Sequence, residues 1–168
     1  MNKKLPLKAP VLLEKYHVLD TFDCGSESLN AYLQQFAYLN IRNNSSRTYV
    51  TARENRVVGY YTIAPGFVKK EDAPSRVGKG LSLHPMPVVI IARLAVDKTE
   101  QKTGIGKGLL KDALIRIVSA ADIIGGRAVL VHAKDDNAAL FYKKFGFEES
   151  PIDRFHLYLL LKDIKISL

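Results

Sequence analysis

The sequence contains one cysteine, Cys24, and no tryptophan. A single cysteine cannot close a disulfide within the chain, which excludes a disulfide-stapled secreted scaffold and makes a reducing cytoplasm the simplest setting. No apolar run approaches the roughly 20 residues of a membrane span. The opening segment, MNKKLPLKAP, also lacks the apolar core of a signal peptide. We therefore expect a soluble, cytoplasmic protein that does not associate with membranes.

Patterns typical of metal sites and covalent catalysis are missing as well. His17, His84, His132 and His156 are scattered without metal-ligand spacing, so no metal site is predicted. His132 falls within an apolar strand pattern and is interpreted as a hydrogen-bonded sheet residue. The sequence shows no cysteine–histidine pair that would indicate an acyl-enzyme, so any group transfer is expected to proceed directly between two bound substrates, without a covalent intermediate. Neither a Walker loop nor a Rossmann fingerprint is present.

The composition is that of an ordinary globular protein with an excess of positive charge. Of 168 residues, 47% are hydrophobic and 25% charged, which predicts one domain, residues 1–168, with a substantial core. Lysine and arginine number 25 against 17 acidic residues, a net charge of +8. Such an excess favours polyanionic partners, namely nucleic acid, an acidic protein or a phosphorylated cofactor, although an ordinary basic surface is the alternative.

The most informative stretch covers residues 87–111. The apolar run PVVIIARLAVD predicts a buried strand, and Gln101-Lys-Thr-Gly-Ile-Gly106 opens onto a helical pattern. One face of this helix carries the apolar residues Leu109, Leu110, Ala113, Leu114, Ile117, Val118 and Ala121. The first turn of a helix presents unpaired N–H groups and a positive dipole end, which bind phosphate when glycines allow close approach. A GxG pattern alone is weak, and a simple tight turn would also explain it.

The remaining elements follow from periodicity and turn residues. Ser26 or Ser28 is a candidate N-cap for a helix that extends to about Ile41. Its buried stripe is expected to comprise Leu29, Leu33, Phe36, Ala37 and Asn40. We expect strands at 10–18, 47–54, 56–65, 87–97, 128–133 and within 150–162, a hairpin turn at Glu54–Asn55, a loop at 69–87 with at most a short helix, and a last helix that starts at Asp135, Asp136 or Asn137 and ends with Gly146 as its C′ residue. This order predicts an α/β or α+β fold, a mixed central β-sheet with helices on both faces.

The stretch also resembles the acetyl-CoA motif of the GNAT (Gcn5-related) N-acetyltransferases, Gln/Arg-x-x-Gly-x-Gly/Ala. Here it reads Gln101, Gly104 and Gly106, and a strand AVLVHA (128–133) followed by NAALFYKKFGF (137–147) matches the family's final element. Four further segments are similar to the acetyltransferase toxins of bacterial type II toxin–antitoxin systems: FDCGSESLNAYL (22–33), SSRTYV (45–50), GYYTIAP (59–65) and IARLAVD (91–97). The resemblance implies the GNAT acyl-CoA N-acyltransferase fold, with the first helical region bordering the acceptor site.

The resemblance also implies how acetyl-CoA would be held. The backbone of β-strand residues Leu94, Ala95 and Val96 would pair with the pantetheine arm, and Asn137 would bond the arm near its end. Gln101 belongs to the motif, and the pyrophosphate would lie on the backbone amides of Lys102, Thr103, Gly104, Ile105, Gly106 and Lys107.

Tyr142 of the NAALFY segment is the candidate catalytic residue. A phenol with a pKa near 10 stays protonated at neutral pH and can donate a proton to a leaving thiolate, as the resemblance implies. The alternative is a core tyrosine bonded to backbone.

No general base is evident, because the strand on which many family members carry a glutamate reads IIARLAV and has Arg93 instead. A lysine side chain, with a pKa near 10.4, needs such a base, whereas an α-amine near 7.7–8.0 is partly neutral already. The sequence thus favours α-amine acceptors, although Glu54 or a histidine could fold into range.

Basic residues are candidates for contacting a tRNA acceptor arm, where phosphate contacts dominate affinity: Arg42, Arg47, Arg76, Lys79 and Arg93. A solvated surface role is the alternative for each. The toxin resemblance implies acetylation of the α-amino group of aminoacyl-tRNA, which halts translation, and inhibition by a small ribbon-helix-helix antitoxin. DNA would be bound only through the antitoxin complex, and a homodimer is implied.

Two other functions remain open from the sequence. The acceptor could be a protein, a peptide or a polyamine, or the chain could be a non-catalytic module that binds CoA or nucleic acid. Intact Gly104, Gly106, Asn137 and Tyr142 argue against a non-catalytic module.

Overall fold

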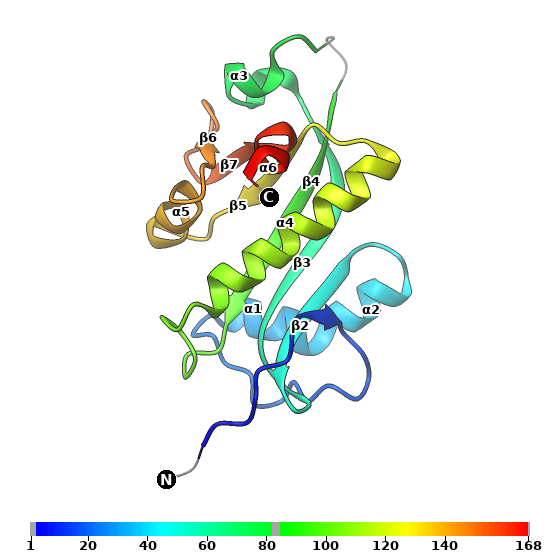
Figure 1. The fold of residues 1–168 in the computed structure, drawn as a ribbon, viewed down its shortest axis with the longest axis vertical. Coiled ribbons are helices and arrows are strands. Elements are labelled where there is room, and N and C mark those ends of the chain that lie inside the picture. Colours follow the sequence, from blue (N-terminus) through cyan, green and yellow to red (C-terminus); the bar gives the residue numbers. More distant parts are fainter. Residues whose placement is uncertain (1–2, 82–84, 168) are drawn as a thin grey trace. The chain divides into compact units, whose positions relative to one another are not determined.

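A computed structural model describes residues 3–81 and 85–167, so His84 lies outside the described residues. The chain divides into two compact units, Met1–Ala64 with Arg93–Ala113 and Pro65–Ala92 with Leu114–Leu168. Strands β3 (Arg56–Val68) and β4 (Met86–Val96) and helix α4 (Ile105–Ile124) each contribute to both units. Strands pair in the order β1-β2-β3-β4-β5-β7-β6, which confirms the expected mixed sheet (Figure 1). In the described part of the chain, no helix has the length and apolar character needed to cross a bilayer.

The first unit is built on an antiparallel ladder of β1 (Val11–Leu12), β2 (Arg47–Arg53) and β3. Glu54, at the predicted hairpin turn, has a φ of 52°. The strand expected over 10–18 is only two residues long. It stops because Glu14 and His17 form a compact turn, in which the Glu14 N–H donates to His17 Nδ1 at 2.9 Å and the His17 N–H to the Glu14 carbonyl at 3.1 Å.

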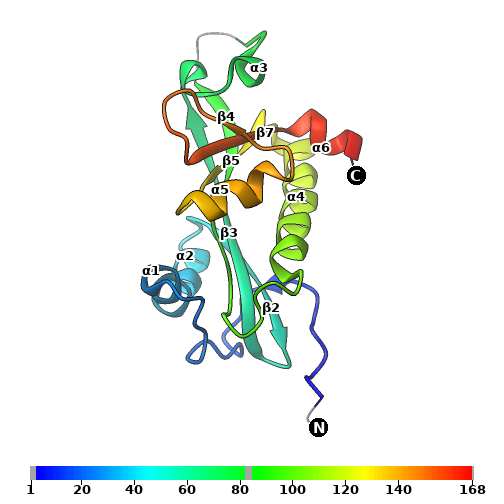
Figure 2. The same cartoon turned by 90° about the vertical axis from the view of Figure 1, so that its left-hand side faces the viewer.

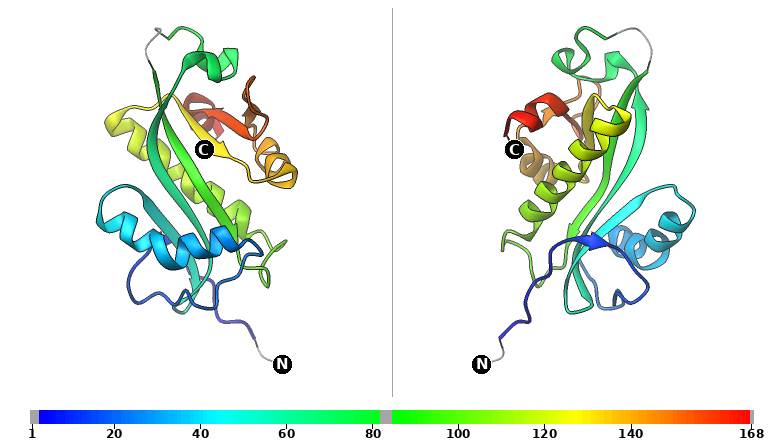
Figure 3. Two further views of the ribbon diagram at one scale, coloured as in Figure 1. Left: turned by 180° about the vertical axis from the view of Figure 1, so that it is seen from behind. Right: turned by 45° about the vertical axis from the view of Figure 1, so that its right-hand side comes forward.

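The first helical segment contains a π-helical insertion that the sequence did not reveal. Of the two candidate N-caps, Ser26 is the one that precedes helix α1 (Glu27–Ala31). The segment η1 (Tyr32–Phe36) is then π-helical, and α2 (Ala37–Arg42) follows (left view of Figure 3). A π turn widens the helix and shifts the register of all later side chains. Ala37 therefore lies on the buried side together with Tyr32 and Leu33, whereas Phe36 is 49% exposed. The prediction that Phe36 belongs to the buried stripe was wrong.

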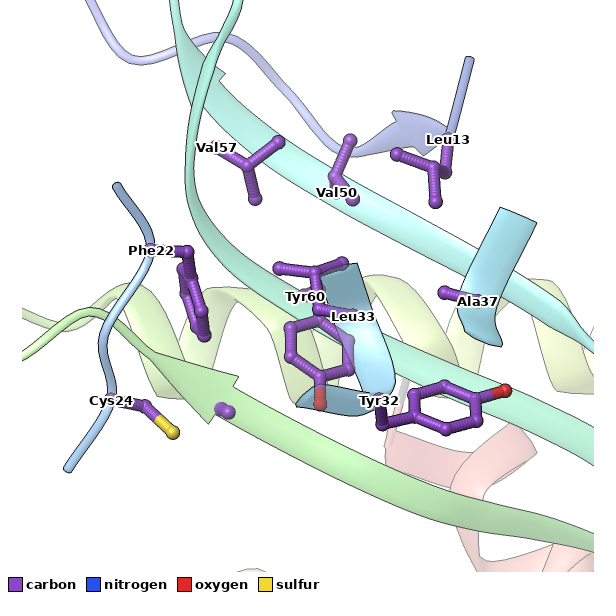
Figure 4. Packing of buried hydrophobic residues seen from close by; sticks show 10 residues of the cluster. Leu13, Phe22, Cys24, Tyr32, Leu33, Ala37, Val50, Val57 and Tyr60 are labelled. Carbon is purple, nitrogen blue, oxygen red and sulfur yellow. The ribbon is translucent and has the colours of Figure 1, made fainter. Parts of the chain in front are cut away.

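Tyr60 lies at the centre of the core of this unit (Figure 4). Its ring packs edge-on against Phe22, with centroids 5.6 Å apart, and stacks loosely on Tyr32 at 6.5 Å. The opposite face of β3 receives α4, since a Cβ added at Gly59 would lie 3.0 Å from a Leu109 methyl. The α1–α2 segment and the first half of α4 thus cover opposite faces of β2 and β3, which confirms helices on both faces (Figure 2).

In the second unit, β5 (Ala128–His132) pairs in parallel with β4 and antiparallel with β7 (His156–Leu160). The short elements η2 (Lys70–Asp72) and α3 (Ser75–Gly78) fit the predicted loop, and Val77 of α3 is buried on the sheet. Strand β6 (Glu148–Glu149) pairs with β7, and helix α6 (Leu161–Ser167) follows β7 in the chain. The sequence predicted neither β6 nor α6.

Helix α5 (Asp136–Lys143) begins where the sequence suggested but ends earlier. Asp135 is its N-cap, and the Asp135 carboxylate accepts the Ala138 N–H at 2.8 Å. Gly146 has a positive φ of 91°, yet it lies beyond the C-cap Lys144 and is not the C′ residue. The helix stops three residues short of Gly146 because the chain turns back through Phe145, whose N–H donates to the Tyr142 carbonyl.

Candidate functional site

Strands β4 and β5 pair over only part of their length. Their register runs from Val88↔Ala128 to Ile91↔Val131, and β5 ends at His132 while β4 continues to Val96. Residues 93–96 of β4 therefore extend past the end of the β5 ladder. An open strand edge of this kind can pair with an extended chain of amides. The predicted pantetheine-binding residues Leu94, Ala95 and Val96 belong to this stretch.

A tight loop, exposed from Gln101 to Gly104, connects β4 to α4. Lys102 and Gly104 have positive φ angles of 64° and 92°, and α4 begins at Ile105. The Gly108 N–H donates to the Gly104 carbonyl at 3.0 Å, so Gly104 occupies the N-cap position directly before the helix. A Cβ added at Gly104 would meet nothing within 4 Å. The loop can therefore admit a phosphate close to the first-turn amides of α4, and Lys102 and Lys107 are exposed beside it.

The side chain of Gln101 shapes this loop from within. Its Nε2 donates to the carbonyls of Val96, at 2.9 Å, and Cys24, at 3.1 Å. Thr103 Oγ1 donates to the Glu100 carbonyl at 2.6 Å. Both side chains donate to carbonyl oxygens of the protein itself, so their geometry suits them to holding the conformation of the loop.

A buried carboxylate that sequence reasoning missed anchors the loop on its other side. Glu100 is 1% exposed, and its oxygens accept from Arg53 at 2.8 Å and Lys4 at 2.7 Å. The hydrogen bonds from Arg53, together with Lys4, outweigh burial and lower the pKa of Glu100 to about 2. The only sequence signal was an acidic residue directly before the Gln101 motif, whose partners are distant in sequence.

Asp97 is a second buried carboxylate of this region. It accepts the Asp23 N–H at 3.0 Å, the Thr99 N–H at 2.9 Å and the Thr99 hydroxyl at 2.7 Å. Burial raises its pKa, but these hydrogen bonds outweigh burial and leave the pKa of Asp97 lowered. Asp97 thus ties the end of β4 to the turn at 22–25.

Arg93 and Tyr32 form a stacked pair on the same unit. The Arg93 guanidinium carbon lies 3.6 Å from the centroid of the Tyr32 ring, a close cation–π contact. The Tyr32 hydroxyl is bonded to Ser46 Oγ and to Asn40 Nδ2, each at 3.2 Å. The ring is therefore fixed in position beneath the guanidinium.

The other basic candidates are divided between the two units. Arg47 donates to the carbonyls of Ser46 and Ile41 and to Asn44, so it holds the α2–β2 loop, while Arg42 is exposed at the end of α2. In the second unit, Arg76 pairs with Asp163 at 2.6 Å, which neutralises it in part, and Lys79 is exposed.

Tyr142 and Asn137 both lie on α5, in the second unit. Tyr142 is 6% exposed, and its ring packs edge-on against Phe141 and Phe147, with centroids 5.2 and 5.5 Å away. Burial raises the pKa of this phenol above its ordinary value, so Tyr142 keeps its proton at neutral pH. Asn137 is exposed on the first turn of the helix.

Known proteins share this architecture. The family described as "Acetyltransferase (GNAT) domain" matches residues 44–149. The chain is 46% identical to the tRNA-acetylating toxin of Mycobacterium tuberculosis strain ATCC 25618 / H37Rv over 157 residues, and this aligned stretch covers 94% of each of the two chains. The solved structure of AtaT complexed with acetyl-methionyl-tRNAfMet is similar with a TM-score of 0.89 and 28% identity, and covers 96% of this chain and 99% of AtaT.

A second solved structure is similar with a TM-score of 0.82 and 27% identity, and covers 97% of this chain and 98% of that one. It holds a tyrosine-to-phenylalanine mutant of the AtaT toxin bound to the C-terminus of the antitoxin AtaR and acetyl-CoA. The family match spans well over half of the sequence, and the similarity to these proteins extends across nearly all of it. The chain therefore belongs to the GNAT acetyltransferase family.

Proposed function

We propose that this protein transfers the acetyl group of acetyl-CoA to the α-amino group of aminoacyl-tRNA and thereby halts translation, as the toxin of a two-gene toxin–antitoxin module. The observation that carries the proposal is the 46% identity to a tRNA-acetylating toxin over 94% of both chains, joined to the open space at Gly104. The net charge of +8 supports a polyanionic acceptor.

Acetyl-CoA fits the residues present. The space in front of Gly104 is open, and the backbone amides from Lys102 to Lys107 would hold the pyrophosphate, with Gln101 and Thr103 shaping the loop. The edge of β4 at Leu94, Ala95 and Val96 would hold the pantetheine arm, with Asn137 near its end. Bound there, acetyl-CoA would supply an activated acetyl thioester.

Tyr142 would act as the general acid. Its phenol is kept protonated by burial and would hold a proton on Oη for delivery to the leaving thiolate. On the acceptor side, Arg93 occupies the strand where a basic carboxylate would lie, so the acceptor is expected to arrive as a neutral amine. The α-amino group of an aminoacyl ester meets this requirement better than a lysine side chain.

The partners follow from the same proposal. A small DNA-binding antitoxin, expected to be of the ribbon-helix-helix type, would neutralise the enzyme, and DNA would be bound only through that complex. Residues 1–168 would form a single acetyltransferase domain, working as a homodimer in the cytoplasm, where aminoacyl-tRNA is found. The solved complex of AtaT with part of the antitoxin AtaR supports the expectation of an antitoxin partner, since this chain and AtaT have the same fold.

An acceptor panel with the purified protein tests the function. Charged tRNA, a lysine peptide and a polyamine are each incubated with labelled acetyl-CoA, and we expect label on charged tRNA alone. Tyr142→Phe should lower this transfer by about 10²-fold or more, the usual contribution of general acid catalysis, and should leave the CoA-induced thermal shift intact. Tyr16→Phe, at a 57% exposed tyrosine, is the matched control and should keep full activity.

Two results would count against the proposal. Label on the peptide or polyamine but not on tRNA would change the acceptor, and full activity of Tyr142→Phe would remove Tyr142 from the chemistry. Growth arrest on expression of the wild type, relieved by Tyr142→Phe at equal soluble protein, is the expected result in cells.

A further inference from the structure

Arg93 is a half-buried cation without a counter-ion. Its guanidinium lies over the Tyr32 ring at 3.6 Å, and among residues 3–81 and 85–167 no carboxylate lies within ion-pair distance of it. A charge that is partly removed from water and left unpaired costs free energy.

The groups that face Arg93 are aromatic. Tyr32 of η1 stacks directly against the guanidinium, and Tyr60 of β3 lies behind Tyr32, with the two ring centroids 6.5 Å apart. Burial raises the pKa of Tyr60, and its hydroxyl donates to the Leu29 carbonyl at 2.7 Å. For Tyr32, burial is outweighed by hydrogen bonds from Ser46 and Asn40, so its pKa is lowered. Cys24 adjoins Tyr60 in the same cluster.

Arg93 also lies where β4 becomes unpaired. The β4–β5 ladder ends at Ile91↔Val131, so Arg93 is the second residue past the last pair and the one that precedes Leu94–Val96. Its charge is thus carried by the same strand edge that is proposed to hold the reactive end of the cofactor. Tyr32, fixed by Ser46 and Asn40, keeps the guanidinium from swinging into solvent.

We propose that Arg93 is a specificity-determining residue that repels cationic amines from the acceptor site and admits a neutral α-amine, an inference that rests on the function proposed above. A unit charge about 6 Å from a bound amine, at an effective dielectric constant of about 20, lowers the pKa of that amine by about 2. An α-amine near 7.7–8.0 then loses its proton readily at neutral pH, whereas a lysine near 10.4 or a polyamine remains charged and is repelled. Arg93, which stands on the strand where many family members carry a basic glutamate, therefore selects an acceptor amine that needs no general base.

The test compares Arg93→Gln with Lys111→Gln, which removes one positive charge from an exposed position on α4. The kcat of acetyl transfer to aminoacyl-tRNA is measured from pH 6 to 9.5, and spermidine is titrated as an inhibitor at pH 7.5. We expect Arg93→Gln to move the inflection of kcat upward by about one pH unit or more, so that kcat falls about tenfold at pH 7 and converges with the wild type at high pH. Spermidine should inhibit the variant at least tenfold more strongly.

Lys111→Gln should change neither quantity, and Arg93→Lys, which keeps the charge, should restore both. Arg93→Met, whose apolar chain can still pack on Tyr32, is the second neutral variant if Arg93→Gln does not fold. The proposal would be overturned if Arg93→Gln lowered kcat equally at every pH and left spermidine inhibition unchanged. It would also be overturned if a higher KM for tRNA were the only change, because that result would indicate a phosphate contact. If the wild type acetylates an amine other than that of aminoacyl-tRNA, the proposed function fails separately, and spermidine inhibition with the acceptor found still tests Arg93.

Discussion

Glu100 is a side chain whose role depends on partners far away in the sequence. Its carboxylate is buried and bridges Arg53 of β2 and Lys4 of the N-terminal segment, immediately before the loop that begins at Gln101. Removing one partner of a buried ion pair leaves the other charge uncompensated. The geometry of the loop therefore depends on an ionised Glu100.

This dependence predicts a loss of stability in acid. Glu100 has a folded pKa of about 2 against 4.5 for the free side chain. Its contribution is fully present above pH 4.5 and is lost as the pH falls from 4.5 towards 2, because the unfolded chain takes up the proton first. Glu100 should account for up to about 3 kcal/mol of the free energy of unfolding at pH 7. Urea unfolding at pH 7, 4 and 2.5 measures it: the difference between the wild type and Glu100→Gln should shrink as the pH falls, and a constant difference would contradict the prediction.

Gly104 offers a test of the loop with a matched control. Gly104 and Gly125 both have positive φ angles, 92° and 86°, and at both an added Cβ meets nothing within 4 Å. Alanine at either position should cost about 1 kcal/mol of stability, because L residues are disfavoured there. Only Gly104→Ala should weaken CoA binding, by about tenfold or ~1.4 kcal/mol, since its methyl group would occupy the space next to the first-turn amides. Calorimetric titration with CoA measures this, and equal affinities of the two variants would show that the phosphate does not approach Gly104.

At the scale of elements, the sequence predicted what local signals determine. Ser26 as an N-cap, the turn at Glu54–Asn55 and the helix that follows Gly104 depend on neighbouring residues, and all three were right. The errors arose where tertiary contacts decide. The turn between Glu14 and His17 cut the first strand short, and β6 exists only because β7 provides an edge for it to pair with.

The candidate site divides along the same line. The glycine motif and the Tyr142 segment could be named as candidates because they match a family pattern of residues at fixed spacing, and their roles stay predictions. Glu100 was not, since Arg53 and Lys4 are distant in the sequence. The stacking of Arg93 on Tyr32 was also hidden, because the two residues are distant in the sequence.

The π-helical register makes a prediction that separates it from an ordinary helix. Leu33 is fully buried in η1, whereas Phe36 is 49% exposed. Leu33→Ala should therefore lower the free energy of unfolding by about 2–5 kcal/mol, through lost burial and a cavity. Phe36→Ala should cost about 1 kcal/mol or less, as for most surface changes. Urea unfolding of both variants decides between the registers, because a regular α-helix would bury Phe36 with Leu33 and make both substitutions costly.

For the whole molecule, the net charge of +8 predicts that activity on a tRNA acceptor depends on salt concentration more steeply than activity on a small acceptor. Each phosphate neutralised by a lysine or arginine releases counterions, so affinity falls steeply with salt concentration. If the acceptor arm engages about four phosphates, kcat/KM for aminoacyl-tRNA should fall about 50-fold or more between 50 and 200 mM salt. A methionine ester, which carries the same α-amine without the polyanion, should lose little over that range and serves as the control. Equal salt dependence for the two acceptors would show that the positive charge does not recruit tRNA, and that recognition is confined to the aminoacyl end.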